Sequence, residues 1–515
     1  MNSQASLRNF TSVLAGLLVL LLPPGLPAEG ITPGAREGAV SWTDDMGDLW
    51  LFGGWGYGST GSSGYLNDLW RYDPGTDEWT WMKGASTINQ WGTYGTQGTP
   101  AAANTPGARR GPVSWTDGSG GLWLFGGEGL SGTGTWVALN DLWLYNPGTN
   151  EWTWMKGSST RGESGIYGTQ GVPAALNTPG ARVYAVSWAD GSGDLWLCGG
   201  LGLDSTGETG RLNDLWRYTP ATDEWTWMKG SNTRHQSGTY GTQGVPAALN
   251  TPGARYGAVS WTDGSGKLWL FGGYGYDSAG GYGPLNDLWK YDPVTGEWTW
   301  MKGSNTREQP GTYGAQGVPA VPNTPGARVR PVSWTDSSGG LWLFGGYGRD
   351  STASEGRLND LWRYNPATYE WTWMKGANTI DHAGTYGTQG VPGAGNTPGG
   401  RDRAVSWVGD SGGFWLFGGS GRDSIGQMGS LNDLWRYNTD TAEWTWMKGA
   451  NTVNQPGTYG RGAWRLRGDL NNDGCTDFAD FLLLLENWGQ LWEGVVMDFS
   501  DFLALLENWG AGPNC

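Results

Sequence analysis

The strongest constraint on this chain is a repeat of fixed length. A Gly-Gly pair follows an apolar segment six times, with its first glycine at Gly53, Gly126, Gly199, Gly272, Gly345 and Gly418, so successive copies lie 73 residues apart. A period of this kind is typical of repeat architectures in which no single unit can bury its own apolar surface. We therefore expect the repeats to pack against one another.

Each copy contains four short apolar segments separated by turn signals. In the fourth copy these segments are 258–261, 268–271, 288–291 and 298–301. The segment LWLF at 268–271 places large apolar side chains on both faces of a strand, so a sheet containing it must lie between neighbouring sheets. The pattern predicts an all-β, six-bladed β-propeller of four-stranded blades over residues 33–449.

The same residues carry a family resemblance. A double glycine follows an apolar strand, Tyr72 comes eighteen positions after Gly54, and Trp79 comes seven positions later, together with LNDLW and a DP turn. This pattern resembles kelch repeats in all six copies, and the resemblance implies a kelch-type propeller. The copies exceed the usual kelch length of about 50 residues, because each has a linker of about 25 residues such as 230–255.

Composition and charge narrow the possible partners. The chain has 93 glycines and 37 tryptophans in 515 residues, which fits a turn-rich body packed with aromatic rings. Its net charge is −16, and no run of basic residues is present. Nucleic acid and anionic membranes need clustered Lys and Arg, so neither is an expected partner.

The N-terminal segment predicts export. Residues 1–28 begin with polar residues and Arg8, continue through an apolar run at 13–22 and end in PPGLPA, as in a secretory signal peptide. An uncleaved anchor is the alternative, but the run is short for a membrane span. The mature protein is expected to be secreted or extracellular, with attachment to a cell surface possible and no membrane insertion.

Two groups of positions differ between otherwise similar copies. One lies at the start of the first strand and the other follows the Gly-Gly pair, and both should open onto the face that carries the long loops. Their aromatic and arginine side chains suit binding to a protein or glycan, although packing between loops is the alternative. The candidate ligand-binding residues are Trp55, Tyr57, Arg110, Tyr184, Tyr256, Tyr274, Arg330, Tyr347, Arg349, Arg403 and Arg422.

The C-terminal region 469–515, after a connector at 450–468, has a calcium-binding pattern. An acidic loop places oxygen ligands at the positions of an EF-hand loop, with Gly474 at its sixth position. The predicted ligands of one calcium ion are Asp469, Asn471, Asp473, Asp477, Asp480 and the carbonyl of Cys475. Acidic residues that cap a helix are the alternative.

This region resembles a dockerin-type half EF-hand. DFADF at 477–481 returns as DFSDF at 498–502, and each is followed by a leucine-rich segment, so a small α-helical calcium-binding module is expected. The resemblance implies attachment to a cohesin-like partner. The second copy lacks the ligand pattern. Whether Cys475 and Cys515 form a disulfide stays open, and Cys198 is expected to be a buried thiol.

The sequence favours a non-enzymatic exported binding or scaffold protein, with the C-terminal module mediating attachment. The alternative is a carbohydrate-active enzyme that degrades polysaccharide in the propeller channel, since the spacing of carboxylates in space cannot be read from sequence. Copper chemistry is disfavoured because His235 and His382 are the two histidines of the chain and both lie in linkers. The ligand and the oligomeric state are not specified by the sequence.

Overall fold

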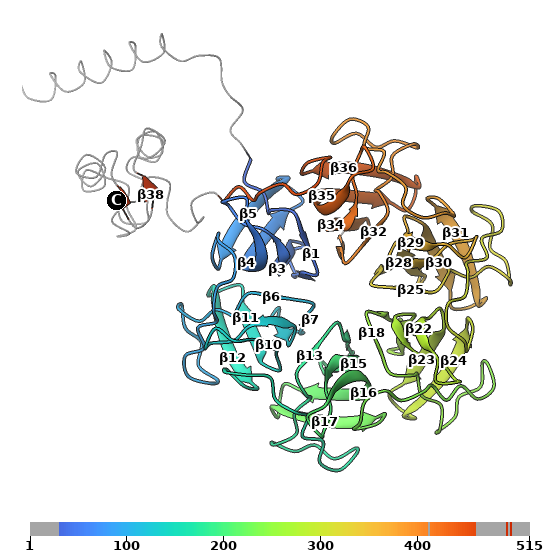
Figure 1. Ribbon diagram of the computed structural model, residues 1–515, viewed down its shortest axis with the longest axis horizontal. Helices are drawn as coiled ribbons and strands as arrows, with labels where there is room; N and C mark the ends of the chain where they lie inside the picture. The colour runs from blue at the N-terminus through green and yellow to red at the C-terminus, as the bar shows by residue number, and fades with distance from the viewer. Residues whose placement is uncertain (1–29, 410–411, 460–490, 493–494, 497–515) are drawn as a thin grey trace, which may run out of the picture.

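The six repeats form a closed ring. The computed structural model describes residues 30–409, 412–459, 491–492 and 495–496, and every regular element in these ranges is a β-strand. Each repeat contributes one antiparallel sheet with four main strands, and in three of the repeats a short fifth strand belongs to the same sheet. The sheets stand around a central axis, and the first and last repeats lie side by side (Figure 1). The arrangement is propeller-like.

Four strand positions recur in every repeat. The innermost strands are β2 (Val40–Thr43), β7 (Val113–Thr116), β14 (Val186–Ala189), β19 (Val259–Thr262), β26 (Val332–Thr335) and β33 (Val405–Val408). The second strands are β3 (Leu49–Tyr57), β8 (Leu122–Phe125), β15 (Leu195–Leu203), β20 (Leu268–Phe271), β27 (Leu341–Phe344) and β34 (Phe414–Arg422). The third strands are β4 (Ser63–Asp73), β11 (Leu142–Asn146), β16 (Thr209–Thr219), β23 (Leu288–Asp292), β30 (Leu361–Asn365) and β35 (Met428–Asn438). The outer strands are β5 (Glu78–Lys83), β12 (Glu151–Lys156), β17 (Glu224–Lys229), β24 (Glu297–Lys302), β31 (Glu370–Lys375) and β36 (Glu443–Lys448).

The Gly-Gly pair is a bulge that divides each sheet. In the first repeat the register of β3 against β4 shifts between Phe52 and Gly54, and Gly53 and Gly54 have φ of 66° and 99°. Beyond the bulge a short strand before each innermost strand completes the sheet: β1 (Arg36–Glu37), β6 (Arg109–Arg110), β13 (Arg182–Val183), β18 (Arg255–Tyr256), β25 (Arg328–Val329) and β32 (Arg401–Asp402). In three repeats this part forms a separate three-stranded sheet with β9 (Glu128–Leu130) and β10 (Trp136–Ala138), β21 (Tyr274–Tyr276) and β22 (Tyr282–Pro284), or β28 (Tyr347–Arg349) and β29 (Glu355–Arg357).

The predicted fold class, a six-bladed propeller of four-stranded blades plus an α-helical module, is wrong in its helical part. The repeated four-stranded sheets are present, and the bulge and a left-handed residue such as Gly38 add short strands to each repeat. The described residues contain no helix. Within 469–515 they form an antiparallel pair, β37 (Leu491–Trp492) and β38 (Val495–Val496), whose β-branched and aromatic residues favour extended backbone.

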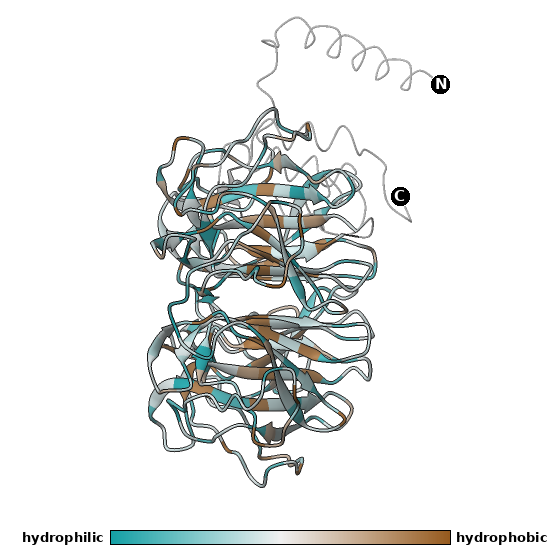
Figure 2. Cartoon of the chain, turned by 90° about the vertical axis from the view of Figure 1, so that its right-hand side faces the viewer, coloured by the Kyte–Doolittle hydropathy of each residue, from teal (hydrophilic) through white to brown (hydrophobic). Residues whose placement is uncertain are grey.

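Aromatic packing joins neighbouring repeats. Every residue of β20 is buried, as expected for a strand covered on both faces, and Figure 2 shows apolar residues along the strands inside the ring. One cluster combines Phe52 of the first repeat with Trp152 of the second at a ring separation of 5.4 Å. The indole of Trp42 in the first repeat donates a hydrogen bond to the Trp123 carbonyl in the second at 3.0 Å. The core of the protein therefore lies between repeats.

A buried ion pair recurs in all six repeats. The guanidinium of Arg109 donates to both carboxylate oxygens of Asp141 at 2.7 and 2.8 Å, and both side chains have no exposed surface. Asp141 also accepts hydrogen bonds from Tyr94 and Trp143, each at 2.7 Å. The equivalent Arg, Asp and Tyr sets are Arg36, Asp68 and Tyr459; Arg182, Asp214 and Tyr167; Arg255, Asp287 and Tyr240; Arg328, Asp360 and Tyr313; Arg401, Asp433 and Tyr386.

The tyrosine of each set comes from the linker of the preceding repeat, and this closes the ring. Tyr459, which follows the sixth repeat, donates to Asp68 of the first repeat at 2.6 Å. Thr32 and Thr458 form a backbone bridge beside it. The Trp407 indole also donates to the Trp50 carbonyl at 3.0 Å. The contact between the last and first repeats therefore repeats the contact between the others.

The long linkers cover the outer strands. The linker after the first repeat bends back on itself through a bridge between Thr93 and Thr105. Its Gly98 amide donates to the Trp154 carbonyl at 2.8 Å, and the Asn104 side chain donates to the Trp152 carbonyl at 3.0 Å. These bonds occupy the free edge of β12, so the linkers protect strand edges as well as connect repeats.

Several predicted features of the termini lie outside the residues that the structure describes. The predicted signal peptide at 1–28, the second half of the connector at 460–468 and the dockerin-like loop fall among them. Among the described residues no helix qualifies as a membrane span. Cys198 is a buried free thiol, as expected from its place in an apolar strand.

The buried ion pair gives a stability prediction. Replacing Asp287 with alanine leaves Arg255, Tyr240 and Trp289 without their acceptor, because all three donate to this carboxylate. Removing one partner of a buried pair is expected to lower the free energy of unfolding by about 3–5 kcal/mol, measured by urea denaturation. The control Glu163→Ala removes an exposed pair with Arg161 and should cost below about 1 kcal/mol. Equal effects of the two variants would contradict the assigned role.

Candidate functional site: the central channel and its mouth

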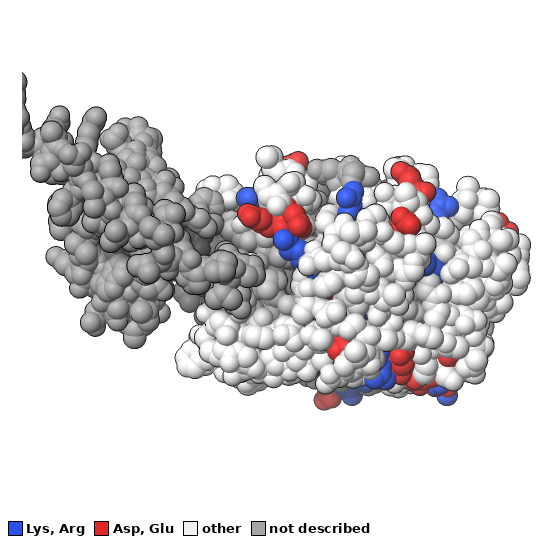
Figure 3. All heavy atoms as spheres, turned by 90° about the horizontal axis from the view of Figure 1, so that it is seen from above, with Lys and Arg blue, Asp and Glu red and all other residues white. Residues whose placement is uncertain are grey.

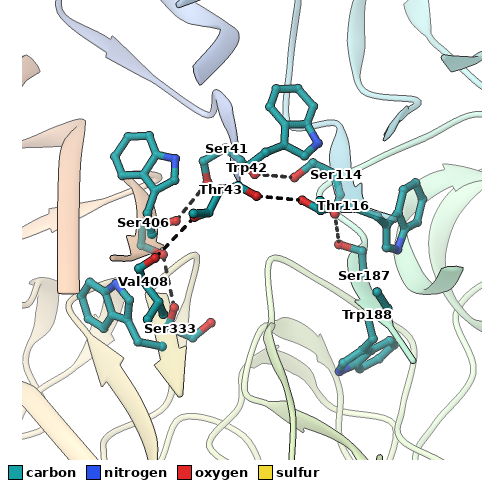
Figure 4. Close-up of a pocket in the computed structure, with 14 residues that line it drawn as sticks. Ser41, Trp42, Thr43, Ser114, Thr116, Ser187, Trp188, Ser333, Ser406 and Val408 are labelled. Carbon is teal, nitrogen blue, oxygen red and sulfur yellow. Dashed lines mark hydrogen bonds between the residues drawn. The ribbon is translucent and has the colours of Figure 1, made fainter. Parts of the chain in front are cut away.

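The innermost strands enclose a channel along the axis of the ring. At one end of this channel, Ser-Trp segments of the innermost strands line a cavity of about 440 Å³. Each serine hydroxyl donates to the serine carbonyl of the preceding repeat, for example Ser114 to Ser41 at 3.1 Å (Figure 4). The Ser41 hydroxyl donates to Ser406 and completes the circle. Because these hydroxyls are already bonded within the ring, this end of the channel is a structural collar.

A second circle of hydrogen bonds lies at the other end of the innermost strands. The Gly111 amide donates to the Gly38 carbonyl at 2.7 Å, and the Tyr184 amide donates to Gly111 at 2.8 Å. The same bond recurs between all neighbouring repeats and ends with the Gly38 amide, which donates to Arg403 at 2.9 Å. Six backbone positions are thus held at fixed places around the channel.

These six positions all have left-handed backbone. They are Gly38, Gly111, Tyr184, Gly257, Arg330 and Arg403, with φ between 52° and 65°. Glycine adopts this conformation without cost, whereas larger residues rarely do. Tyr184, Arg330 and Arg403 are therefore held in a strained conformation at the channel mouth. Strain of this kind tends to gather where a side chain has a function.

Charged residues meet at this mouth. Arg403 is paired with Glu37 of the first repeat and lies 3.3 Å from Asp402. Arg330 lies 3.4 Å from Asp402, and its guanidinium lies 5.7 Å from the centre of the Tyr184 ring. We call Glu37, Arg110, Tyr184, Arg330, Asp402 and Arg403 the mouth cluster. It contains three arginines and two carboxylates, so it is net positive in an acidic chain.

Tyr184 extends across the mouth. A Cβ atom built on Gly111 would lie 2.7 Å from its ring, and one built on Gly38 would lie 3.2 Å from its hydroxyl. The hydroxyl oxygen is buried and has no hydrogen-bond partner among the described residues. Burial raises the pKa of Tyr184, although three nearby arginines oppose this shift. The neutral hydroxyl is thus an available donor next to a positively charged cluster.

The mouth cluster continues outward along the interfaces between repeats. Arg110 pairs with Glu128 at 3.2 Å and lies over the Tyr65 ring. Arg357 donates to Asp402 at 3.0 Å and to the Ser420 carbonyl at 3.1 Å. Seen from the edge, charged side chains gather toward the two flat faces of the ring, and the visible rim is mostly uncharged (Figure 3).

A group of tyrosines surrounds one further arginine. The guanidinium of Arg211 lies 4.4 Å from the centre of the Tyr282 ring and 5.9 Å from that of Tyr256. The ring centre of Tyr274 lies 5.9 Å from that of Tyr256, with the rings stacked, and 4.7 Å from that of Tyr282. We call Arg211, Tyr256, Tyr274 and Tyr282 the tyrosine–arginine cluster. Its four side chains are all half-buried.

The structure divides the predicted ligand-binding residues into groups. Arg110, Tyr184, Arg330 and Arg403 meet in the mouth cluster, and Tyr256 and Tyr274 meet in the tyrosine–arginine cluster. Tyr347 lies beneath the guanidinium of Arg357. The remaining predicted residues lie beyond the bulge: Trp55 and Tyr57 on β3, Arg349 paired with Glu308 and Glu355, and Arg422 paired with Asp381.

Sequence reasoning missed Glu37, Asp402 and Arg211. Glu37 and Asp402 occupy the same repeat position as Arg110 and Tyr256, so a strict alignment of the six copies would have included them. Arg211 lies on a third strand and reaches Tyr256 only because β16 packs beside the next repeat. No local pattern in the sequence signals that contact.

The predicted calcium site is not among the described residues. All six predicted calcium ligands lie outside the described ranges. Within those ranges no group of three or more His, Cys, Asp or Glu side chains is arranged to hold a metal ion. His235 is exposed beside Tyr276, and His382 contacts Thr379 in its linker.

Comparisons with known proteins give little further information. The chain matches none of the protein-family models and none of the curated proteins with which it was compared. It is similar to a solved structure described as "Structure of YjhT", with a TM-score of 0.48 and 16% identity over 81% of this chain and 99% of that chain. A likeness this weak assigns no function to the chain.

The strain at Tyr184 gives a prediction. Glycine and alanine at this position both remove the side chain, but only glycine fits a φ of 52° without strain. The variant Tyr184→Gly should be more stable than Tyr184→Ala by about 1 kcal/mol in urea denaturation. Two variants of equal stability would show that the backbone at the mouth is not held in the left-handed region.

Proposed function

We propose that this protein is an exported, non-enzymatic binding or scaffold protein whose channel mouth recognises a protein or glycan. One observation carries the proposal: the repeats are nearly identical in their strands, yet the positions that differ gather at the mouth as arginines and aromatic residues. Structural packing alone would be served equally well by glycine there, because Gly38, Gly111 and Gly257 occupy three of the six equivalent places.

The physical chemistry of the mouth supports binding. Arginine offers a planar fork of donors to carboxylates, and aromatic rings stack on sugars or flat peptide groups. The scaffold beneath is rigid, because two circles of inter-repeat hydrogen bonds fix its backbone and serine side chains. A fixed scaffold lowers the entropy that a binding site loses when its ligand is bound.

The mouth favours binding over acid–base catalysis. Glu37 is paired with Arg403, and Asp402 lies against Arg330, Arg357 and Arg403. Paired carboxylates in glycosidases instead face the scissile bond across an open space. No described feature specifically favours the carbohydrate-active enzyme that the sequence left as an alternative.

The sequence supports attachment through the C-terminal region. Its acidic loop resembles a dockerin calcium loop, and the repeats resemble kelch repeats. We propose that the loop binds one calcium ion through Asp469, Asn471, Asp473, Asp477, Asp480 and the Cys475 carbonyl. A cohesin-like protein is the proposed partner of this region, and the mature protein is proposed to be extracellular.

A double variant tests the binding function. The double variant Tyr184→Gly, Arg330→Gly places at these two positions the glycine that three other repeats already have there, so the ring should still fold. The labelled wild-type protein is expected to bind glycans on an array, and the double variant should lose roughly tenfold or more in affinity for them. Arg161→Gln, an exposed arginine in a linker, serves as the control.

A double variant that retained wild-type affinity while folded would contradict the proposed site. A wild-type protein that bound no glycan would remove the glycan part of the proposal. Binding of a purified protein partner would then have to depend on Tyr184 and Arg330 for the proposal to stand.

Calcium removal tests the C-terminal assignment. Titration calorimetry of the chelator-treated protein should show binding of one calcium ion, and Asp473→Ala should abolish it because one charged oxygen ligand is lost. Asp501→Ala, in the second copy that lacks the ligand pattern, is the matched control and should bind normally. Unchanged binding by the Asp473 variant would reject the assignment.

A further inference from the structure

Arg211 has no acidic partner in the part of the chain that the structure describes. No described residue forms an ion pair or a side-chain hydrogen bond with it, and its Nε atom is buried without a hydrogen-bond partner. A guanidinium in this state has lost part of its water and has not gained an acceptor. The charge is partly compensated by the faces of Tyr256 and Tyr282, which attract cations through their ring quadrupoles.

Two repeats further along the chain, the equivalent arginine has the acidic partner that Arg211 lacks. Arg357 occupies the place of Arg211, and it donates to Asp402 at 3.0 Å and to the Ser420 side chain at 3.2 Å. Near Arg211, Tyr256 occupies the repeat position of Asp402, and Tyr274 occupies the repeat position of Ser420. Arg357 therefore has a carboxylate partner at the position where Arg211 has a tyrosine.

Other charges near the tyrosine–arginine cluster do not fill this gap. Glu308 and Glu355 lie on the Tyr274 side, and both are paired with Arg349 at 3.7 and 3.1 Å. Arg234 lies on the other side and is paired with Glu208 at 3.0 Å. None of these described carboxylates is paired with Arg211.

The tyrosines supply the remaining features of a ligand site. Three half-buried tyrosine rings lie at the site: Tyr256 and Tyr282 face the guanidinium, and Tyr274 packs next to both of them. Burial raises the pKa of Tyr282 to about 12, so its hydroxyl stays neutral near pH 7 and does not repel an anion. Aromatic faces stack on the apolar side of a sugar ring, and phenolic hydroxyls exchange hydrogen bonds with sugar hydroxyls.

We propose that the tyrosine–arginine cluster binds an acidic saccharide, with the carboxylate of a uronic acid residue on Arg211 and its sugar ring on the tyrosines. This inference rests on the proposed binding function and names its ligand class. The carboxylate takes the place that Asp402 occupies beside Arg357. Hydroxyl-bearing rings around a single positive charge fit a hydroxylated ring with one negative charge better than a peptide.

The test uses the full-length protein with oligogalacturonate and with its methyl ester, which has the same sugar chain without the charge. Titration calorimetry should detect binding of the acid, and the ester should bind roughly 10- to 100-fold more weakly, as expected for loss of a charge-assisted hydrogen bond. Arg211→Gln should weaken binding of the acid by a similar factor and leave binding of the ester unchanged. Arg211→Lys should restore part of the affinity.

Arg161→Gln is the control because it removes an exposed linker arginine that belongs to neither cluster. It should retain the affinity for oligogalacturonate. Equal affinity for acid and ester, or an unchanged affinity in folded Arg211→Gln, would overturn the inference. Preferential binding of oligoglutamate would overturn the saccharide assignment. A glycan that binds wild type and Arg211→Gln equally would overturn this site while the proposed binding function stood. Failure of all glycans would remove this site and the glycan part of the proposed function.

Discussion

The ring depends on a buried arginine–aspartate pair that is repeated six times. Each pair is expensive to desolvate, and it is tolerated because its carboxylate accepts four hydrogen bonds, from arginine, tyrosine and tryptophan donors. The tyrosine comes from the preceding linker, so one carboxylate ties together strands and linker of two repeats. The same geometry at Asp68 and Tyr459 makes the last repeat a neighbour of the first.

This rigid framework separates structural from variable positions. Tryptophans, serines and the Gly-Gly bulge are used in every repeat to pack sheets and to set backbone direction, so they offer little room for change. The left-handed positions at the mouth are different, because three repeats have glycine there and the fold needs no side chain at these positions. Tyr184, Arg330 and Arg403 occupy such positions and give the mouth a charge opposite to that of the whole chain. The binding role that we propose for the mouth would account for the retained strain.

The sequence predicted the repeat and its packing well because both are local or periodic. Burial on both faces of Leu268–Phe271 follows from its apolar run, and the arginines at the mouth follow from comparing the six copies. The four main strands of each repeat were predicted, but the additional short strands were not, because the effect of a bulge on the ladder depends on backbone angles at Gly53 and Gly54, which composition does not specify. The Arg211 contact could not be predicted, since it depends on how one repeat packs on the next. The predicted helical module gains no support from the two short strands described near the C-terminus.

Ring closure is the claim on which the site depends, because the mouth exists only if the first and sixth repeats meet. Native-state hydrogen exchange tests it most directly at the amides of the inner hydrogen-bond circle: Gly38, Gly111, Tyr184, Gly257, Arg330 and Arg403. A closed ring predicts similar protection at all six amides, since each donates to the preceding repeat. Rapid exchange at Gly38, with the other five protected, would show an open array and contradict the account.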